Sequence, residues 1–398
     1  MDTIFETSNR LTESVQTDSY RYLYDKINWN HRLIMLKGAR GVGKTTMILQ
    51  HIKNTFGTSD SALYASLDQL WFASHSISEL ADYHYKHGGT HLFLDEIHLY
   101  QGNWQREVKV IHDSYPGYHV VFTGSSLLQL DSSLADLSRR CVDYTLTGLS
   151  FREYLEFEGL GKFESFSLEE ILSNHRQISS EINSRIKALP LFERYSGFGY
   201  YPFYRNFDKV TYAMQIQKVI DTIISYDIPA VENVEYETLH KIRRLLMILS
   251  ESTPFTLEVS ALSRQTGVSR SQLLKLVGLL SKGCVLRQLH HKGIAPKEVV
   301  KPAKLLFDNT DIMVALAINP NAGTRRETFA ASMLSQAHKL TMPKDGDLEA
   351  DSKYLFEVGG KKKGFGQIAD IPGSYVLADD IESGFGNKLP LWILGFLY

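Results

Sequence analysis

Residues 38–45 have the types and the spacing that bind the phosphate groups of a nucleotide. Glycines in such a loop let backbone N–H groups approach phosphate oxygens closely, and the N-terminus of the following helix adds partial positive charge. The lysine of this pattern reaches the β- and γ-phosphates, and the next hydroxyl holds Mg²⁺. The expected binding residues are Gly38, Ala39, Arg40, Gly41, Val42, Gly43, Lys44, Thr45 and Thr46.

Two adjacent carboxylates form a second candidate group. Asp95 and Glu96 follow the apolar residues 92–94, a pattern that predicts a buried parallel strand ending in acids. Ligands of open α/β sheets bind at the carboxyl ends of the strands. We therefore expect Asp95 beside Mg²⁺ and Glu96 as the group that polarises the attacking water. A solvated acidic pair at a strand end is the alternative interpretation.

Two later segments offer polar side chains to the same site. Thr123 and Ser125 follow an expected strand over 118–122, and either hydroxyl could hydrogen-bond the γ-phosphate or the attacking water. A plain turn is the alternative. Arg139 and Arg140 precede the next expected strand, and either could reach a phosphate as an arginine finger, including one supplied across a subunit boundary. A surface arginine pair is the alternative there.

A parallel sheet is needed to position these groups. Short apolar segments that alternate with helical ones predict an α/β fold, namely a P-loop NTPase sheet with helices on both faces. Helical spacing over 8–30 also predicts a lead-in helix against this domain. The expected strands are 33–36, 62–67, 91–94 and 118–122.

Composition limits the function classes. The chain has 398 residues, enough for two or three domains, and a net charge of −2, which gives no global attraction to DNA or membranes. Its two cysteines, Cys141 and Cys284, suggest neither a disulfide framework nor a metal cluster. The N-terminal segment lacks a signal-peptide core, and no apolar run approaches the ~20 residues that span a bilayer. We therefore expect a cytoplasmic protein with no membrane partner.

Five motifs occur in one order that resembles prokaryotic AAA-type ATPases with a C-terminal restriction-endonuclease-like domain. They are residues 38–45, 94–96, 123–126, 139–140 and 149–155, the last reading Leu-Ser-Phe-Arg-Glu-Tyr-Leu. The resemblance implies an ATP-binding fold that uses ATP and Mg²⁺. It carries the family's roles to Lys44, Thr45, Asp95, Glu96, Ser125 and Arg140, although Arg139 fits nearly as well.

The resemblance and the segment patterns together divide the chain into four parts. They are an AAA-type ATP-binding domain over 1–155, a helical linker over 156–240, a winged helix over 241–295 and a restriction-endonuclease-like α/β domain over 296–398. The winged helix rests on helical segments at 242–249, 259–265 and 269–280, followed by a hairpin from residue 284.

The third of these helical segments offers candidate DNA contacts. Residues 241–292 contain nine Lys and Arg against two Glu, so the segment is locally basic. Arg270, Gln272 and Lys275 face away from the leucines and could meet a major groove of double-stranded DNA. Packing against another subunit or domain is the alternative.

The resemblance also implies a nuclease-like site in the last part of the chain. Nucleases of that fold bind Mg²⁺ with an Asp and a Glu and orient the nucleophile with a nearby Lys. The groups that correspond here are Glu327, Asp347, Glu357 and Lys361. The usual pattern places the lysine two residues after the glutamate, where Gly359 stands. Either Lys361 replaces it, or the fold is inactive and serves binding or assembly.

These observations predict an oligomeric, ATP-hydrolysing switch or motor coupled to double-stranded DNA or to a protein partner. A homo-oligomer is expected because the arginine finger can come from a neighbouring subunit. One alternative is a Mg²⁺-dependent DNA nuclease gated by ATP. The other is a non-enzymatic sensor that holds the nucleotide as a structural ligand in signalling or assembly.

Overall fold

The computed structural model describes residues 1–124, 137, 139–231, 236–251, 255–256, 259–293 and 301–398. The chain forms two compact units, Met1–Gly148 and Leu149–Tyr398. The first unit ends before residue 155, because residues 149–155 pack within the second unit. The backbone N–H of Leu149, for example, donates to the carbonyl of Tyr200 at 2.7 Å.

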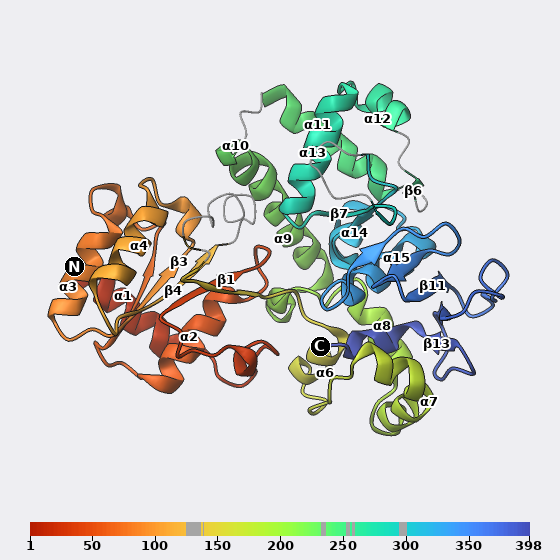
Figure 1. Ribbon diagram of the computed structural model, residues 1–398, viewed down its shortest axis with the longest axis horizontal. Coiled ribbons are helices and arrows are strands. Elements are labelled where there is room, and N and C mark those ends of the chain that lie inside the picture. The colour runs from red at the N-terminus through yellow and green to blue at the C-terminus, as the bar shows by residue number, and fades with distance from the viewer. Residues whose placement is uncertain (125–136, 138, 232–235, 252–254, 257–258, 294–300) are drawn as a thin grey trace. The chain divides into compact units, whose positions relative to one another are not determined.

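A five-stranded parallel sheet forms the centre of the first unit (Figure 1). Its strands run in the order β2-β3-β4-β1-β5, and every neighbouring pair is parallel. This confirms the predicted P-loop NTPase type of sheet. The bounds are β1 Leu33–Lys37, β2 Ala62–Ser66, β3 His91–Asp95, β4 His119–Gly124 and β5 Val142–Thr145.

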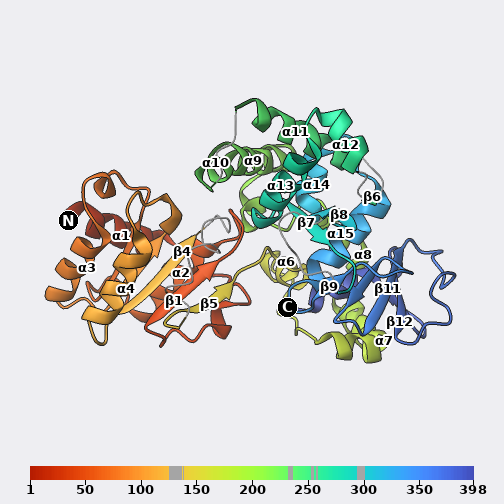
Figure 2. The same ribbon diagram turned by 45° about the horizontal axis from the view of Figure 1, so that its top comes forward.

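Helices flank this sheet (Figure 2). They are α1 Asp2–Ser14, α2 Lys44–Thr55, α3 Ile77–Lys86 and α4 Trp104–Ser114, with 3₁₀ turns η1 Tyr24–Lys26, η2 Leu70–Ala73 and η3 Ile97–Leu99. The prediction that the lead-in helix lies over 8–30 was wrong in its bounds. Helix α1 ends at Ser14 because its buried side of Ile4, Ser8 and Thr12 stops there, and the apolar residues after it belong to η1 and a loop.

The second unit begins with helices. They are α6 Phe151–Phe157, α7 Leu168–Arg185, α8 Ala188–Tyr195, η5 Pro202–Asn206 and α9 Lys209–Thr222, which continues through a π turn, η6 Ile223–Asp227, into α10 Ile228–Val231. Capping boxes mark the N-termini of two of these helices. Ser150 and Glu153 exchange side-chain and backbone hydrogen bonds at α6, and Ser167 and Glu170 do so at α7.

Three further helices pack with a small antiparallel sheet. They are α11 Tyr236–Ser250, α12 Val259–Thr266 and α13 Arg270–Lys282, and all three were expected from the sequence. The sheet runs β6-β8-β7, from β6 Phe255–Thr256, β7 Leu286–Leu289 and β8 Lys304–Phe307. Strand β8 belongs to the range assigned to the restriction-endonuclease-like domain, but it lies between β6 and β7 because it pairs with both.

The last part of the second unit is a mixed sheet with two helices, α14 Thr310–Leu316 and α15 Ala322–Leu334. Its order is β13-β12-β11-β10-β9, with β11, β12 and β13 parallel and the other pairs antiparallel. The bounds are β9 Leu340–Thr341, β10 Leu348–Ala350, β11 Tyr354–Gly359, β12 Ser374–Ala378 and β13 Lys388–Pro390, followed by η7 Leu391–Phe396. In the described ranges, no helix combines the length and apolar character needed to cross a membrane.

Candidate nucleotide-binding site

The predicted phosphate-binding loop connects β1 to the N-terminus of α2. Gly43 caps α2 with φ at 98°, and Gly41 has φ at 84°, values that residues with a side chain rarely adopt. Gly38 is needed for space, since a Cβ there would lie 2.1 Å from the carbonyl oxygen of Leu146. The glycines at these positions therefore allow the tight turn and direct it at the helix N-terminus, where a phosphate binds favourably.

Lys44 is folded back over this loop. Its side chain is buried, and Nζ donates to the carbonyl oxygens of Gly38 at 3.0 Å and Ala39 at 2.9 Å. Both acceptors are neutral, whereas a phosphate bound in the loop would offer charged oxygens, which make stronger hydrogen bonds. The ammonium is thus placed within the loop that would hold a phosphate.

The predicted magnesium ligands lie next to each other. Thr45 Oγ1 donates to Asp95 Oδ2 at 2.6 Å, which joins the start of α2 to the end of β3. Asp95 is 2% exposed. A hydroxyl and a carboxylate in contact supply the hard oxygen ligands that Mg²⁺ prefers, so these two residues fit the ion.

Asp95 is held by further hydroxyl groups from neighbouring strands. Tyr64, in β2, donates from its hydroxyl to Asp95 Oδ2 at 2.9 Å, and Thr123, in β4, donates to Oδ1. Burial and the Asp95 carboxylate raise the pKa of Tyr64, so this hydroxyl stays protonated. Thr123 was one of the two predicted polar residues at this strand end. The other, Ser125, lies outside the described residues.

Glu96 adopts an uncommon backbone conformation beside the loop, with φ at 52°. Its N–H donates to Asp95 Oδ1 at 3.1 Å and to Thr123 Oγ1 at 3.2 Å. Its carboxylate Oε2 lies 3.4 Å from Nδ1 of His98. Burial, followed by the charges of Arg40 and Lys44, lowers the pKa of His98 to about 4, so this imidazole is neutral at pH 7.

The two candidate arginines lie away from this loop in their own chain. Strand β5 runs parallel to β1 with Val142 opposite Ile34, so Arg140 is level with the start of β1, at the opposite end from Lys37 and the loop. Arg140 forms a bidentate ion pair with Asp113. Its Nε lies 2.9 Å from Oδ1, and a terminal guanidinium nitrogen lies 3.1 Å from Oδ2. Arg139 is exposed.

One buried arginine beside this loop could not be identified as a site residue from the sequence. Arg21 is 5% exposed and donates to three backbone carbonyls, those of Val42, Thr147 at 2.8 Å and Gly148 at 2.9 Å. It therefore joins the phosphate-binding loop to the end of the first unit. No motif surrounds it, and its partners are backbone atoms, so residue types alone could not have identified it.

The candidate DNA contacts are exposed on α13. Arg270 contacts the hydroxyl of Ser260 on α12, and Gln272 donates to Thr238 Oγ1 on α11 at 3.2 Å. Lys275 lies one turn further along the same helix. All three side chains are exposed, but Arg270 and Gln272 are two positions apart and lie on different sides of the helix.

The structure brings three of the four nuclease-like residues into one charged cluster with two lysines. Lys304 pairs with Glu327 and lies 3.7 Å from Asp347, while Glu357 pairs with Lys363. Lys361 does not join them and is exposed. Burial, with Asp347 and Glu357 nearby, raises the pKa of Glu327 to about 7, and Lys304 opposes that shift. In the part of the chain that the structure describes, no group of three or more His, Cys, Asp and Glu is arranged to hold a metal ion.

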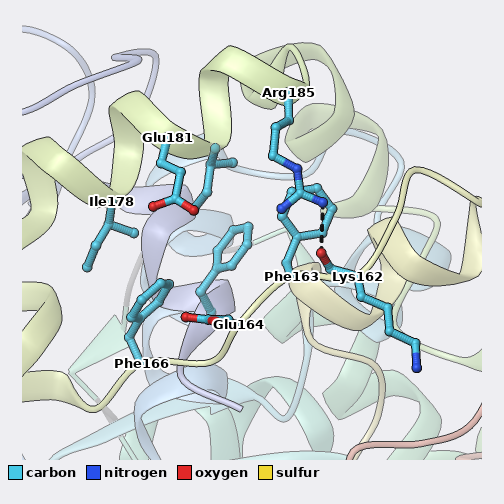
Figure 3. Close-up of a pocket in the computed structure, with 9 residues that line it drawn as sticks. Lys162, Phe163, Glu164, Phe166, Ile178, Glu181 and Arg185 are labelled. Atoms are coloured by element: carbon cyan, nitrogen blue, oxygen red, sulfur yellow. Dashed lines mark hydrogen bonds between the residues drawn. The ribbon is translucent and has the colours of Figure 1, made fainter.

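A pocket of about 310 Å³ lies elsewhere in the second unit, between α7 and the segment that precedes it (Figure 3). Its lining combines apolar side chains, such as Phe166 and Ile178, with charged ones, and two exposed carboxylates, Glu164 and Glu181, project beside it. On the other side, Arg185 stacks over the Phe163 ring at 4.0 Å. None of the predicted site residues lines this pocket.

Comparisons with known proteins identify the first unit. A family model described as an AAA domain matches residues 30–155, and one described as a domain of unknown function matches residues 189–322. An uncharacterized protein of Methanocaldococcus jannaschii is 28% identical over 325 residues, which cover 77% of this chain and 68% of that protein. Residues 30–155 are therefore an AAA-type, P-loop ATPase-like domain.

Solved structures show only distant similarity. AMPPCP-bound DnaA from Aquifex aeolicus is 17% identical with a TM-score of 0.26, covering 65% of this chain and 84% of that chain. PCH-2 from C. elegans is 15% identical with a TM-score of 0.24, covering 39% of this chain and 44% of that chain. The chain thus spans less than half the length of PCH-2. Similarity at these TM-scores carries no conclusion about this chain.

Proposed function

We propose that this chain binds ATP with Mg²⁺ through residues 38–46 and hydrolyses it. The observation that carries the proposal is the 2.6 Å hydrogen bond from Thr45 Oγ1 to Asp95 Oδ2. This bond brings the hydroxyl after the P-loop lysine to the carboxylate at the end of β3, which is the pairing that holds Mg²⁺ in P-loop enzymes. Bound Mg²⁺ would supply positive charge to the β- and γ-phosphate oxygens.

Protein groups supply the remaining chemistry in this proposal. Lys44 exchanges the carbonyls of Gly38 and Ala39 for phosphate oxygens, and the N–H groups at the start of α2 stabilise negative charge. Glu96, at the same edge of the sheet, polarises the attacking water. Thr123 and Tyr64 keep the Asp95 carboxylate in one orientation through their hydroxyl groups.

The position of Arg140 supports action in an oligomer. Because Arg140 and Arg139 lie at the opposite end of β1 and β5 from the phosphate-binding loop, they serve the site of a neighbouring subunit in this proposal. Hydrolysis would then depend on how the subunits are packed. The chain would act as a homo-oligomeric switch or motor.

Exposed basic residues on α13 support coupling to double-stranded DNA. Helices α11 to α13 and the sheet β6-β8-β7 have the element order of a winged helix, and Arg270, Gln272 and Lys275 are all exposed on α13. In this proposal α13 contacts DNA, and the mixed sheet that follows is a restriction-endonuclease-like module used for binding or assembly.

ATP turnover by the full chain, with and without double-stranded DNA, tests the proposal when combined with the mass in solution. We expect Mg²⁺-dependent turnover in an oligomer and an increase when DNA is added. An ATP turnover rate that does not change when DNA is added would contradict DNA coupling and favour a protein partner. Nucleotide retained without any turnover would contradict the hydrolase and favour the structural sensor.

A further inference from the structure

The charged cluster in the second unit contains a lysine at its centre. Lys304 is 5% exposed, and its Nζ pairs with Glu327 Oε2 while lying 3.7 Å from Asp347 Oδ1. Glu327 comes from α15 and Asp347 directly precedes β10, so one ammonium group is shared by carboxylates from two elements. This is the position in which a divalent cation would bridge the two acids.

The backbone of Lys304 restricts how far this ammonium can move. Strand β8 is the central strand of its sheet, and Lys304 pairs with Thr256 on one side and with Leu289 on the other. The buried side chain of Lys304 therefore starts from a backbone position that is fixed on both sides. Removing the ammonium from the acids would leave a buried charge unpaired, which is strongly unfavourable.

The third carboxylate of the cluster has its own lysine. Glu357 is 3% exposed, and its Oε1 pairs with Lys363. Gly359 makes this possible, because a Cβ at that position would lie 2.6 Å from Cγ of Lys363. Lys388 fixes the turn by donating to the carbonyls of Lys361 and Lys363, each at 2.8 Å. Three carboxylates therefore share two ammonium groups.

We infer that the Lys304 ammonium takes the place of a divalent cation between Glu327 and Asp347, and that the cluster is therefore closed to Mg²⁺ and Mn²⁺. An ammonium group and a metal ion cannot occupy the same site between two carboxylates. This inference does not depend on ATP hydrolysis at the first unit. It assigns the cluster to an internal ion network that joins β8 to α15, and it excludes metal-dependent cleavage there.

Binding of Mn²⁺ to the full chain without nucleotide tests the inference, measured by the electron paramagnetic resonance signal of free Mn²⁺. The variants are K304M, K304M/E327Q and K353M, and the last removes an exposed lysine that pairs with Glu169 outside the cluster. We expect K304M to gain one Mn²⁺ site, with a Kd at least about tenfold below any wild-type binding. K304M/E327Q should lose that site, and K353M should match the wild type.

Two results would overturn the inference. One is wild-type Mn²⁺ binding that E327Q removes, a measurement that does not require any change at Lys304. The other is a folded K304M variant that gains no Mn²⁺ site. If K304M does not fold, K304Q keeps a polar group near Glu327 and allows the same measurement.

Discussion

The Arg152 guanidinium donates a 2.9 Å hydrogen bond to the backbone oxygen of Tyr398, 246 positions away in the sequence. Ser150 Oγ donates to the same oxygen at 2.9 Å, and Arg152 also pairs with Glu156 at 2.7 Å. The motif over 149–155 therefore fastens the end of the chain to α6. This contact explains why the motif belongs to the second unit.

Replacing Arg152 with alanine should destabilise the second unit. R152A would remove a donor from the Tyr398 oxygen and leave the partly buried Glu156 carboxylate without its cation, so we expect a loss of about 2–4 kcal/mol. Equilibrium unfolding in urea measures this loss. The control is R185A, which removes an exposed arginine stacked on Phe163 and should cost less than about 1 kcal/mol. Equal losses in the two variants would contradict the anchoring role.

Replacing Glu96 with glutamine should separate nucleotide binding from hydrolysis. E96Q keeps the shape of the side chain but removes the carboxylate that polarises water, so turnover should fall by about 10²–10⁴-fold. Affinity for ATP should stay within about threefold of the wild type, because Lys44 and the loop are unchanged. The comparison variant K44A should instead weaken ATP binding. Unchanged turnover in E96Q would exclude Glu96 as the catalytic group.

An oligomer whose sites are completed by a neighbour's arginine should show complementation. We expect R140A and E96Q each to be inactive alone, while mixed assemblies recover part of the turnover. In a mixed assembly, a subunit with an intact Glu96 can receive Arg140 from an E96Q neighbour. Turnover of the mixture, measured against each variant alone, checks this.

The matched control for this experiment is R139A, which changes the adjacent exposed arginine. If mixing with E96Q raises the turnover of R139A above that of either variant alone, and mixing with E96Q does not do so for R140A, the arginine finger is Arg139. Full activity of both single arginine variants would contradict a finger at either position.

The buried carboxylate of Asp311 predicts a dependence of stability on pH. It accepts from the backbone N–H groups of Gly199 at 3.0 Å and Tyr200 at 2.8 Å and from the Tyr212 hydroxyl. Burial raises the pKa of Asp311 from 3.8 to about 6. The folded state therefore binds the proton more tightly, so this stabilisation is complete below about pH 4 and is lost as the pH rises through 6.

In the variant D311N the side chain at position 311 cannot titrate, so comparison with the wild type isolates the contribution of Asp311. Between pH 7 and pH 4, the unfolding free energy of the wild type should rise relative to that of D311N by about 2 kcal/mol. Urea unfolding of both proteins across this range measures the difference. A difference that stays constant with pH would show that Asp311 titrates alike in the folded and unfolded states.

Local patterns predicted much of the first unit. The glycines of residues 38–45 and the acids after 92–94 are set by short-range chemistry, so the loop, its helix and the sheet could be expected from the sequence. The hydrogen bond from Tyr64 to Asp95 could not, because it depends on the pairing of β2 with β3 rather than on nearby residue types. For the same reason the role of Arg21 could not be predicted, because its partners are carbonyls far away in the chain.

The second unit was harder to predict because its charged groups meet across long sequence distances. Spacing suggested Lys361 beside Glu357, but the turn that Lys388 fixes directs Lys363 there instead. The ion pairs of Lys304 could not be predicted, since its partners lie more than twenty residues further along the chain. Sequence spacing cannot show which lysine reaches a buried acid when a turn or a strand crossing comes between them.

The guanidinium of Arg21 has thermodynamic consequences for nucleotide affinity. This rigid plane fixes its N–H directions, so the carbonyls of Val42, Thr147 and Gly148 have to move together or lose hydrogen bonds. Residues 147–148 are the last of the first unit, and Val42 lies in the loop proposed to bind phosphate. If this loop binds nucleotide as proposed, a displacement of residues 147–148 that alters the loop would change its affinity for nucleotide, and nucleotide binding would by linkage displace residues 147–148.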